Sequence, residues 1–175
     1  MAKDKLSTKG AAVSGDAAQY AVFRVGGEDY AIDIMRIMEI IRPQKVTRIP
    51  KSPEFVEGVI NLRGKVVPII DLRKRFGIAS EASDSKKVRV VIVRMAGRVV
   101  GTVVDEVTEV LYIRPDQVET TPEAVRGDGA DYLMGVGKVG ERLIVLLDME
   151  KVLSKDEVVK LHAAEELAKG AGRAG

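Results

Sequence analysis

Residues 57–72 read EGVINLRGKVVPIIDL, in which two apolar runs enclose the charged turn LRGK at 62–65. A Gly-containing pair between two runs of β-branched residues is typical of a β-hairpin. The stretch therefore predicts two antiparallel strands, with the Arg63 side chain at an exposed tip. Gly58 and Gly64 lie in the same turn-rich segment, and we expect positive φ angles at both because glycine adopts them at little steric cost.

The same pattern recurs along the chain. Gly26-Gly27, Ala96-Gly97 and Gly140-Glu141 each stand between short apolar runs, as Arg63-Gly64 does. Short β-branched runs separated by Gly-containing turns indicate antiparallel strands rather than helices. The sequence therefore predicts an all-β fold of short strands.

The chain also repeats itself. Residues 20–41, shifted by 70 positions, align without a gap with residues 90–111, so that Glu39 meets Glu109. Residues 58–76, shifted by 77 positions, align with residues 135–153. The seven extra residues fall in a polar connection, where a difference in length is easily absorbed. The chain thus contains two copies of one unit.

Each copy is expected to form a small barrel of about five strands, because closure removes exposed sheet edges. A unit of about 60 residues buries little core on its own, so we expect the two barrels to share one. We place a disordered tail at 1–18, the first barrel at about 19–85 and the second at about 86–153. The repeat leaves open whether the barrels exchange strands.

A helix is expected to follow the second barrel, over residues 154–170. Ser154 and Glu157 form a capping-box pattern, and Gly170 is a typical residue for the end of a helix. The last residues, 171–175, are expected to fray. The fold class is therefore all-β, with two barrel subdomains, short helices and a C-terminal helix.

Composition narrows the classes of function. The 175 residues are 46% hydrophobic and 31% charged, with a net charge of +2 and no cysteine. The small net charge gives no overall attraction for nucleic acid or anionic lipid, and the absence of cysteine excludes disulfides and thiolate metal sites. The first residues lack the apolar core of a secretory signal, and no apolar run approaches bilayer length. We expect a cytoplasmic protein without direct membrane insertion.

No catalytic or metal site can be assembled from the sequence. GVGKVG at 135–140 matches a dinucleotide fingerprint, but a strand-like run follows it, so we interpret it as a hairpin turn. His162 is the only histidine and has no evident partner to orient it. Asp71 and Asp148 occupy equivalent positions in the two repeats and are expected to cap the short helices after them. We therefore expect no cofactor, no metal and no enzymatic activity.

Small barrels often bind single-stranded nucleic acid, and the basic run 73–75 raises that alternative. Such binding uses aromatic side chains on which bases stack, yet the chain has no Trp and only 4% aromatic residues. A solvated helix face is the favoured interpretation of the run. A nucleic-acid-binding small barrel remains the alternative function, and an unrecognised enzyme would need a deep pocket lined by titrating groups.

Four segments resemble the CheW family, the adaptors of bacterial chemotaxis. They are YAVFRVGGEDYAIDIMRIMEI (20–40), VTRIPKSPEFVEGVINLRGKVVPIIDLR (46–73), RVVGTVVDEVTEVL (98–111) and LIVLLDMEKVL (143–153), in the family's order. EGVINLRG followed by VPIIDL is the most specific of these matches. The same domain occurs in the CheA kinase and in CheV, but this chain has no room for a kinase or receiver domain. It therefore resembles the stand-alone adaptor.

The resemblance implies two SH3-like five-stranded barrels around a common core. It also implies a non-catalytic protein that couples the cytoplasmic tip of chemoreceptors to the regulatory domain of CheA. Such a protein is a monomer alone, is recruited to membrane receptor arrays, and builds rings and arrays with its partners.

The resemblance also implies particular site residues. Glu39 and Arg63 are similar to the family's pair for receptor and kinase coupling, with Gly58 and Gly64 beside them. Apolar positions of both repeats are similar to the residues that line the family's receptor groove. These are Ile34, Ile37 and Ile40 in the first repeat and Val104, Val107 and Val110 in the second.

Overall fold

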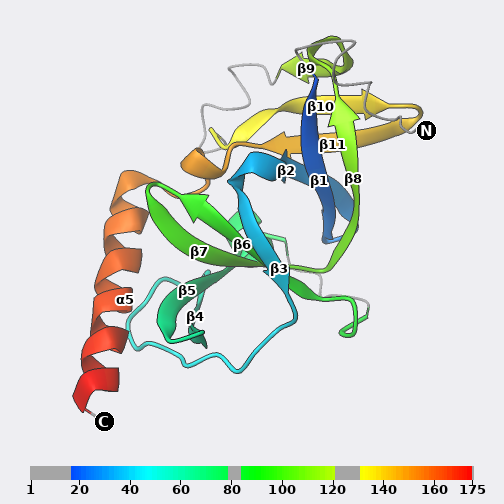
Figure 1. The fold of residues 1–175 in the computed structure, drawn as a ribbon. Coiled ribbons are helices and arrows are strands. Elements are labelled where there is room, and N and C mark those ends of the chain that lie inside the picture. Colours follow the sequence, from blue (N-terminus) through cyan, green and yellow to red (C-terminus); the bar gives the residue numbers. More distant parts are fainter. Residues whose placement is uncertain (1–16, 79–83, 121–130, 175) are drawn as a thin grey trace.

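The computed structural model describes residues 17–78, 84–120 and 131–174 (Figure 1). The first repeat supplies β1 (Ala18–Val25), β2 (Glu28–Asp33), η1 (Ile34–Arg36), β3 (Ile37–Ile41), β4 (Val56–Leu62), β5 (Lys65–Asp71) and α3 (Leu72–Phe76). The second supplies β6 (Arg89–Met95), β7 (Arg98–Val104), β8 (Glu106–Ile113), η2 (Pro115–Gln117), β9 (Val118–Thr120), β10 (Leu133–Val139), β11 (Arg142–Leu147) and η3 (Met149–Lys151). Helix α5 (Lys155–Ala174) follows.

The four predicted hairpin turns are confirmed. They join β1 to β2, β4 to β5, β6 to β7 and β10 to β11, and each pair is antiparallel. At the tip of the β4–β5 hairpin, Arg63 has φ 52° and Gly64 has φ 88°. Positive φ at both central residues is typical of the turn type that matches the twist of paired strands.

The strands form two sheets, and each sheet takes strands from both repeats. The five-stranded sheet has the order β3-β6-β7-β5-β4, so the β6–β7 hairpin of the second repeat lies among strands of the first. The six-stranded sheet has the order β8-β1-β2-β11-β10-β9, so the β1–β2 hairpin of the first repeat lies among strands of the second. The boundary near residue 85 therefore separates the sequence repeats, whereas each sheet contains strands from both sides of it.

We call β6–β7 and β1–β2 the exchanged hairpins, and the sheet that each of them enters its host. A parallel strand pair joins each exchanged hairpin to its host. β5 pairs with β7, with Ile69 opposite Gly101, and β2 pairs with β11, with Ala31 opposite Leu146. The 70-residue shift places Ala31 on Gly101, so both junctions have a small residue at the same place. A Cβ at Gly101 would lie 2.5 Å from Ile69 Cδ1, so close packing across this junction requires glycine.

The predicted fold class is confirmed: the protein is an all-β molecule of two subdomains with a C-terminal helix. The two sheets occupy different parts of the molecule (Figure 1), and each has its own small apolar cluster. A larger cluster contains residues of both sheets, among them Phe23, Ile70, Val93 and Leu147, and extends to Leu161 of α5. This cluster is the shared core that the size of each repeat required.

The sixth strand, β9, has a weaker counterpart in the first repeat. β9 pairs with β10 at Gly135, and Thr47 forms a single bridge with Val59 of β4. In both places the edge backbone passes directly over a glycine. A Cβ would lie 2.1 Å from the Thr47 carbonyl oxygen at Gly58 and 2.4 Å from the Glu119 carbonyl oxygen at Gly135.

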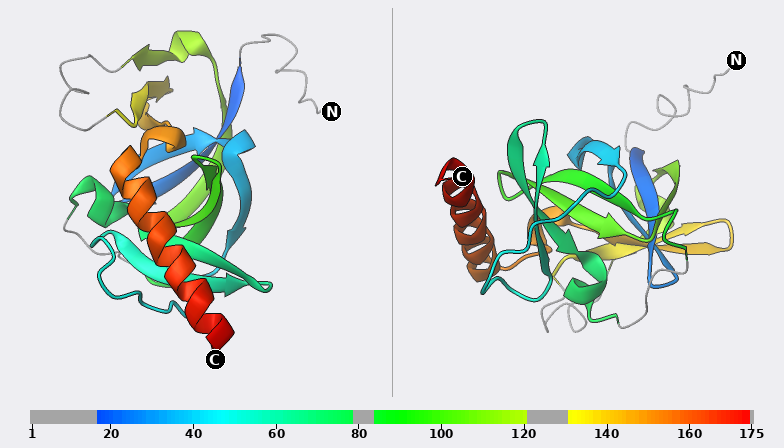
Figure 2. Two further views of the ribbon diagram at one scale, coloured as in Figure 1. Left: turned by 90° about the vertical axis from the view of Figure 1, so that its left-hand side faces the viewer. Right: turned by 90° about the horizontal axis from the view of Figure 1, so that it is seen from below.

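Helix α5 lies beside β4 and β5, at one end of the molecule (Figure 2). The predicted capping box is confirmed, since the Glu157 amide donates to Ser154 Oγ at 3.1 Å and the Ser154 amide donates to Glu157 Oε1 at 2.8 Å. The helix continues to Ala174, so Gly170 does not end it. One glycine costs a helix only about 1 kcal/mol, which flanking alanines can offset.

The basic run 73–75 has structural partners instead of forming a solvated helix face. The Arg75 guanidinium lies over the rings of Phe55 and Tyr132, donates to the Val152 carbonyl at 2.8 Å and pairs with Glu157. Arg73 lies within 3.6 Å of carboxylates of Asp71 and Asp105. Both arginines therefore hold α3 to neighbouring elements.

Alanine substitutions at the two glycines of residues 57–72, Gly58 and Gly64, should destabilise the protein to different extents. Gly58 and Gly64 both have positive φ, as expected, at 140° and 88°. Replacing Gly64 by alanine meets no atom within 4 Å, so only backbone strain of about 1 kcal/mol is expected. Gly58→Ala adds a clash with the Thr47 carbonyl, so we expect a loss above about 3 kcal/mol. Chemical denaturation measures both, and equal losses would contradict the steric explanation.

Candidate partner-binding site

The tip of the β4–β5 hairpin carries an exposed ion pair. Arg63 Nη2 binds Glu39 Oε2, and Nη1 donates to Glu39 Oε1 at 3.3 Å, so the guanidinium holds the carboxylate with two nitrogens. The Arg63 side chain is 68% exposed and that of Glu39 is 33% exposed. The hydrogen bond from Arg63 to Glu39 raises the pKa of Arg63 above its ordinary value. The pair is thus a fixed, charged feature of the surface.

The hairpin turn fixes the position of Arg63. The Gly64 amide donates to Asn61 Oδ1 at 2.7 Å, which closes the turn with a side chain. Glu39 lies on β3, and β3 and β4 are the two opposite edges of the five-stranded sheet. The ion pair therefore links β3 to the turn that follows β4, that is, the two edges of this sheet.

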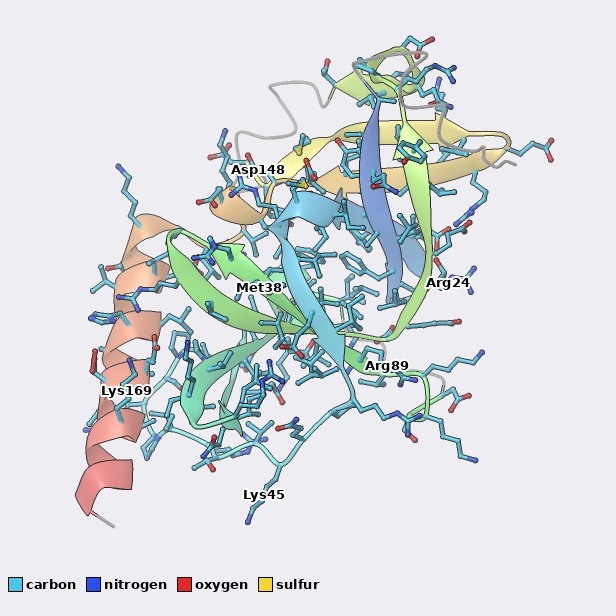
Figure 3. All side chains as sticks on the ribbon, in the orientation of Figure 1. Arg24, Met38, Lys45, Arg89, Asp148 and Lys169 are labelled. Carbon is cyan, nitrogen blue, oxygen red and sulfur yellow. The ribbon has the colours of Figure 1, made fainter. Side chains whose placement is uncertain are left out.

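An open cleft of about 1120 Å³ lies beside the pair. Its inner surface includes the apolar residues Leu62, Val67 and Ile92, which belong to the core of this barrel. The β4–β5 hairpin, the β6–β7 turn and α5 surround it. Met38 on β3 and Lys169 on α5, both labelled in Figure 3, belong to its lining. An apolar floor with a charged rim is typical of a surface that binds another protein.

The second barrel has an equivalent pair. Glu109 occupies the position of Glu39 under the 70-residue shift, and it binds Arg142, which occupies the position of Lys65 under the 77-residue shift. Arg142 also donates to Asp29 at 3.1 Å, and its side chain is 39% exposed. Hydrogen bonds to Glu109 and Asp29 raise the pKa of Arg142. Sequence reasoning aligned Glu109 but did not identify Arg142.

The six apolar candidates do not form one continuous surface. Ile40 and Val110 are 42% and 48% exposed and can contact a partner. Ile37 and Val107 are partly buried and pack against the shared core. Ile34, in η1, is half-buried.

Val104 is only 1% exposed and lies in the shared core. The structure therefore gives it a packing role instead of a place on the groove surface. The cause is the two-residue period of β7, which turns Val100 and Val104 to the same, inner side.

Exposed apolar side chains near these candidates were missed by the sequence analysis. Met35 is 86% exposed and Met38 is 51% exposed, beside Ile40, while Tyr112 is 48% exposed, two residues from Val110 on β8. The two-residue period of the strands could have indicated Met38 and Tyr112, because they share a face with Ile40 and Val110. Met35 lies in η1, where that period does not apply.

The described residues include no group of three or more His, Cys, Asp or Glu side chains that could hold a metal ion. Asp71 and Asp148 accept hydrogen bonds from the Arg73 and Glu150 amides at 2.9 and 3.0 Å, which confirms the predicted caps. The 135–140 glycines lie in the β10–β11 hairpin, as predicted. Within 17–78, 84–120 and 131–174, no helix is long and apolar enough to span a bilayer.

Comparisons with known proteins agree on one family. The CheW-like domain model matches residues 19–157. The chain is 42% identical to chemotaxis protein CheW of Klebsiella aerogenes over 80% of this chain and 84% of that protein. It is 38% identical to chemotaxis protein CheW of Helicobacter pylori over 81% of this chain and 84% of that protein. The crystal structure of the scaffolding protein TtCheW from Thermoanaerobacter tengcongensis matches with a TM-score of 0.73 at 34% identity, covering 81% of this chain and 90% of that one.

The exposure of the Glu39–Arg63 pair predicts that it contributes little to stability. Exposed ion pairs gain little Coulomb energy in water, and salt screens what they gain. A double-mutant cycle with Glu39→Gln and Arg63→Met should therefore show no measurable coupling in the free energy of unfolding at physiological salt. A strong, salt-independent coupling would instead make the pair a structural closure of the barrel.

Proposed function

The chain belongs to the CheW family of chemotaxis adaptors, and on that premise we propose that it couples chemoreceptors to the histidine kinase CheA without catalytic activity of its own. The observation that supports this most is the Glu39–Arg63 pair, which is charged, exposed and held by a closed turn. An exposed pair of this kind contributes little to stability. It is suited to recognition by a partner, where electrostatic complementarity sets orientation and specificity.

A coupling protein must bind two partners at once, and the molecule offers two kinds of surface. Ile40 and Met35 lie on and beside β3, whereas Val110 and Tyr112 lie on β8, and these exposed apolar side chains suit the apolar face of a helix. The cleft beside Arg63 instead combines apolar floor and charged rim. We propose that the tip of the receptor hairpin and the regulatory domain of CheA divide these surfaces between them.

The same reasoning leads to an assembly. A duplicated fold presents two similar but unequal ends, and contacts between unlike ends generate rings when the rotation closes. We propose that the protein is a monomer alone, is recruited from the cytoplasm to membrane receptor arrays, and builds rings and arrays with its partners. No cofactor is required for this role.

The nucleic-acid alternative is not favoured. Arg73 and Arg75 are engaged with carboxylates and aromatic rings inside the protein. The aromatic residues Tyr30, Phe76 and Tyr132 stack on one another, with ring centroids 5.2 and 5.0 Å apart, instead of standing free for bases. Salt-sensitive retention of the chain on single-stranded nucleic acid would reverse this judgement.

Reversing the charge at Arg63 should uncouple receptor and kinase without unfolding the protein. Arg63→Glu places a second carboxylate beside Glu39 and removes the cation that a partner would meet, and like-charge contacts at an interface can cost several kcal/mol of binding. We expect kinase stimulation to fall at least about tenfold when the variant replaces wild type with receptor membranes, CheA and ATP.

Lys160→Glu is the matched control, since Lys160 is exposed on α5 and pairs only with the exposed Asp156 among the described residues. It should stimulate the kinase as wild type does. Thermal unfolding of both variants is measured in parallel. Normal stimulation by Arg63→Glu would remove Arg63 from the site, and a collapsed melting temperature would show that the tip is structural.

The effect of replacing each apolar candidate by aspartate should depend on how exposed its side chain is. Ile40→Asp and Val110→Asp change exposed side chains, so we expect stability to change by less than about 1 kcal/mol while binding to receptor membranes weakens. Val104→Asp buries an unpaired carboxylate and should cost about 4 kcal/mol or more. Denaturation and membrane co-sedimentation give the two readouts. Unchanged receptor binding by both Ile40→Asp and Val110→Asp would exclude these side chains from the receptor-binding surface.

A further inference from the structure

Helix α5 forms one side of the cleft that contains the Glu39–Arg63 pair. Glu165, Ala168 and Lys169 line the cleft from α5, together with Asn61 to Val67 of the β4–β5 hairpin. The helix stands at one end of the molecule, and Figure 2 shows it alongside the β4–β5 region. The width of the cleft therefore depends on where the second half of α5 is held.

The two halves of α5 are held by different forces. The first half is anchored by its capping box, by the Arg75–Glu157 pair and by Leu161, which is 1% exposed in the shared core. Beyond Leu161 no large apolar side chain is buried among the residues whose side chains are described. Leu167 is 64% exposed, and the buried positions are Ala164 and Glu165.

Glu165 is the main polar anchor of the second half. It is only 9% exposed, it accepts a hydrogen bond from Arg98 Nη1 at 3.0 Å, and its other oxygen lies 3.4 Å from Lys169 Nζ. Arg98 is the first residue of β7, just after the β6–β7 turn. Lys169 moves with the helix, so Arg98 is the cation that ties the nearly buried carboxylate to another element and favours one docked position of the helix.

The β6–β7 turn, which precedes Arg98, is also held by Glu150 of η3. The Ala96 amide donates to Glu150 Oε1 at 3.0 Å, and the other oxygen of Glu150 binds Arg36. Arg36 ends η1, immediately before the strand that carries Glu39. A continuous series of contacts thus runs around the cleft, from α5 through the β6–β7 turn to β3.

We propose that Arg98 and Glu165 are positioning residues for partner binding: their ion pair holds the second half of α5 as the wall of the cleft and so sets the shape that a partner meets beside Arg63. The inference rests on the proposed coupling function. Arg98 itself lines the cleft, and the role proposed for it is to act through α5 and not by touching the partner. Coupling of receptor to kinase therefore depends on the docked position of α5, and the Arg98–Glu165 ion pair controls that position.

The test compares three variants in the complete chain. Arg98→Met removes the charge but keeps an apolar stem, Arg98→Lys keeps the charge, and Lys160→Met removes a cation from the exposed face of the same helix. Because the chain has no cysteine, spin labels at Lys65→Cys and Ala168→Cys report the distance across the cleft in the partner-free protein. Kinase stimulation with receptor membranes and CheA, using the unlabelled variants, is the second readout.

We expect Arg98→Met to broaden and lengthen the distance distribution and to lower kinase stimulation about threefold or more. Arg98→Lys should restore most of both readouts, and Lys160→Met should leave both at the wild-type level. Thermal unfolding is followed throughout. If Arg98→Met does not fold, Glu165→Gln provides the same loss of the ion pair with a smaller change in shape.

Three outcomes would overturn the inference. The first is normal stimulation with an unchanged distance distribution in Arg98→Met, the second is normal stimulation with a broadened distribution, and the third is lost stimulation with an unchanged distribution, which would mean that Arg98 touches the partner. The failure of the proposed function looks different. In that case the wild-type chain itself does not stimulate CheA in the presence of receptor membranes, while the spin labels still report whether Arg98 holds α5.

Discussion

The exchange of hairpins between the two repeats is the constraint on which the structure depends. Without β6–β7, the first repeat would keep β3 separated from β4 and β5, with unpaired edges on each side. Each hairpin joins its host by one antiparallel and one parallel pair, and the parallel pair contains a small residue, Ala31 or Gly101. The sheets cannot form separately, so the shared core and the relative position of the two barrels are determined together.

Charged contacts hold the tip of each exchanged hairpin. Asp105 accepts from the Gly26 amide at 2.8 Å and lies 3.6 Å from Arg73, whereas Glu150 accepts from the Ala96 amide and binds Arg36. Asp105 follows β7 and Glu150 lies in η3, so both acids come from the second repeat, and both arginines come from the first. Each carboxylate satisfies a turn amide that would otherwise lack a partner.

Much of the fold could be predicted because its signals are local. Turn glycines, the caps at Asp71, Asp148 and Ser154, and the repeat itself are written in short segments. The exchange was left open because identical repeats can pair within or between copies with the same side chains, and only packing decides. Val104 was assigned to a surface for a related reason. Sequence alignment shows which residue occupies a given position, but whether that residue is buried depends on which strand covers it. Arg142 was missed because its partners lie 33 and 113 residues away.

The duplication also explains how one fold can present two different ends. At one end Arg63 faces a single carboxylate and is 68% exposed, so its charge remains available to a partner. At the other end Arg142 faces both Glu109 and Asp29 and is 39% exposed, so its charge is largely satisfied within the protein. The equivalent carboxylates Glu39 and Glu109 thus bind arginines from different positions of the two hairpins, and only Arg142 has a second carboxylate, Asp29. An adaptor placed between unlike partners needs this asymmetry, because two identical ends would bind the same partner twice.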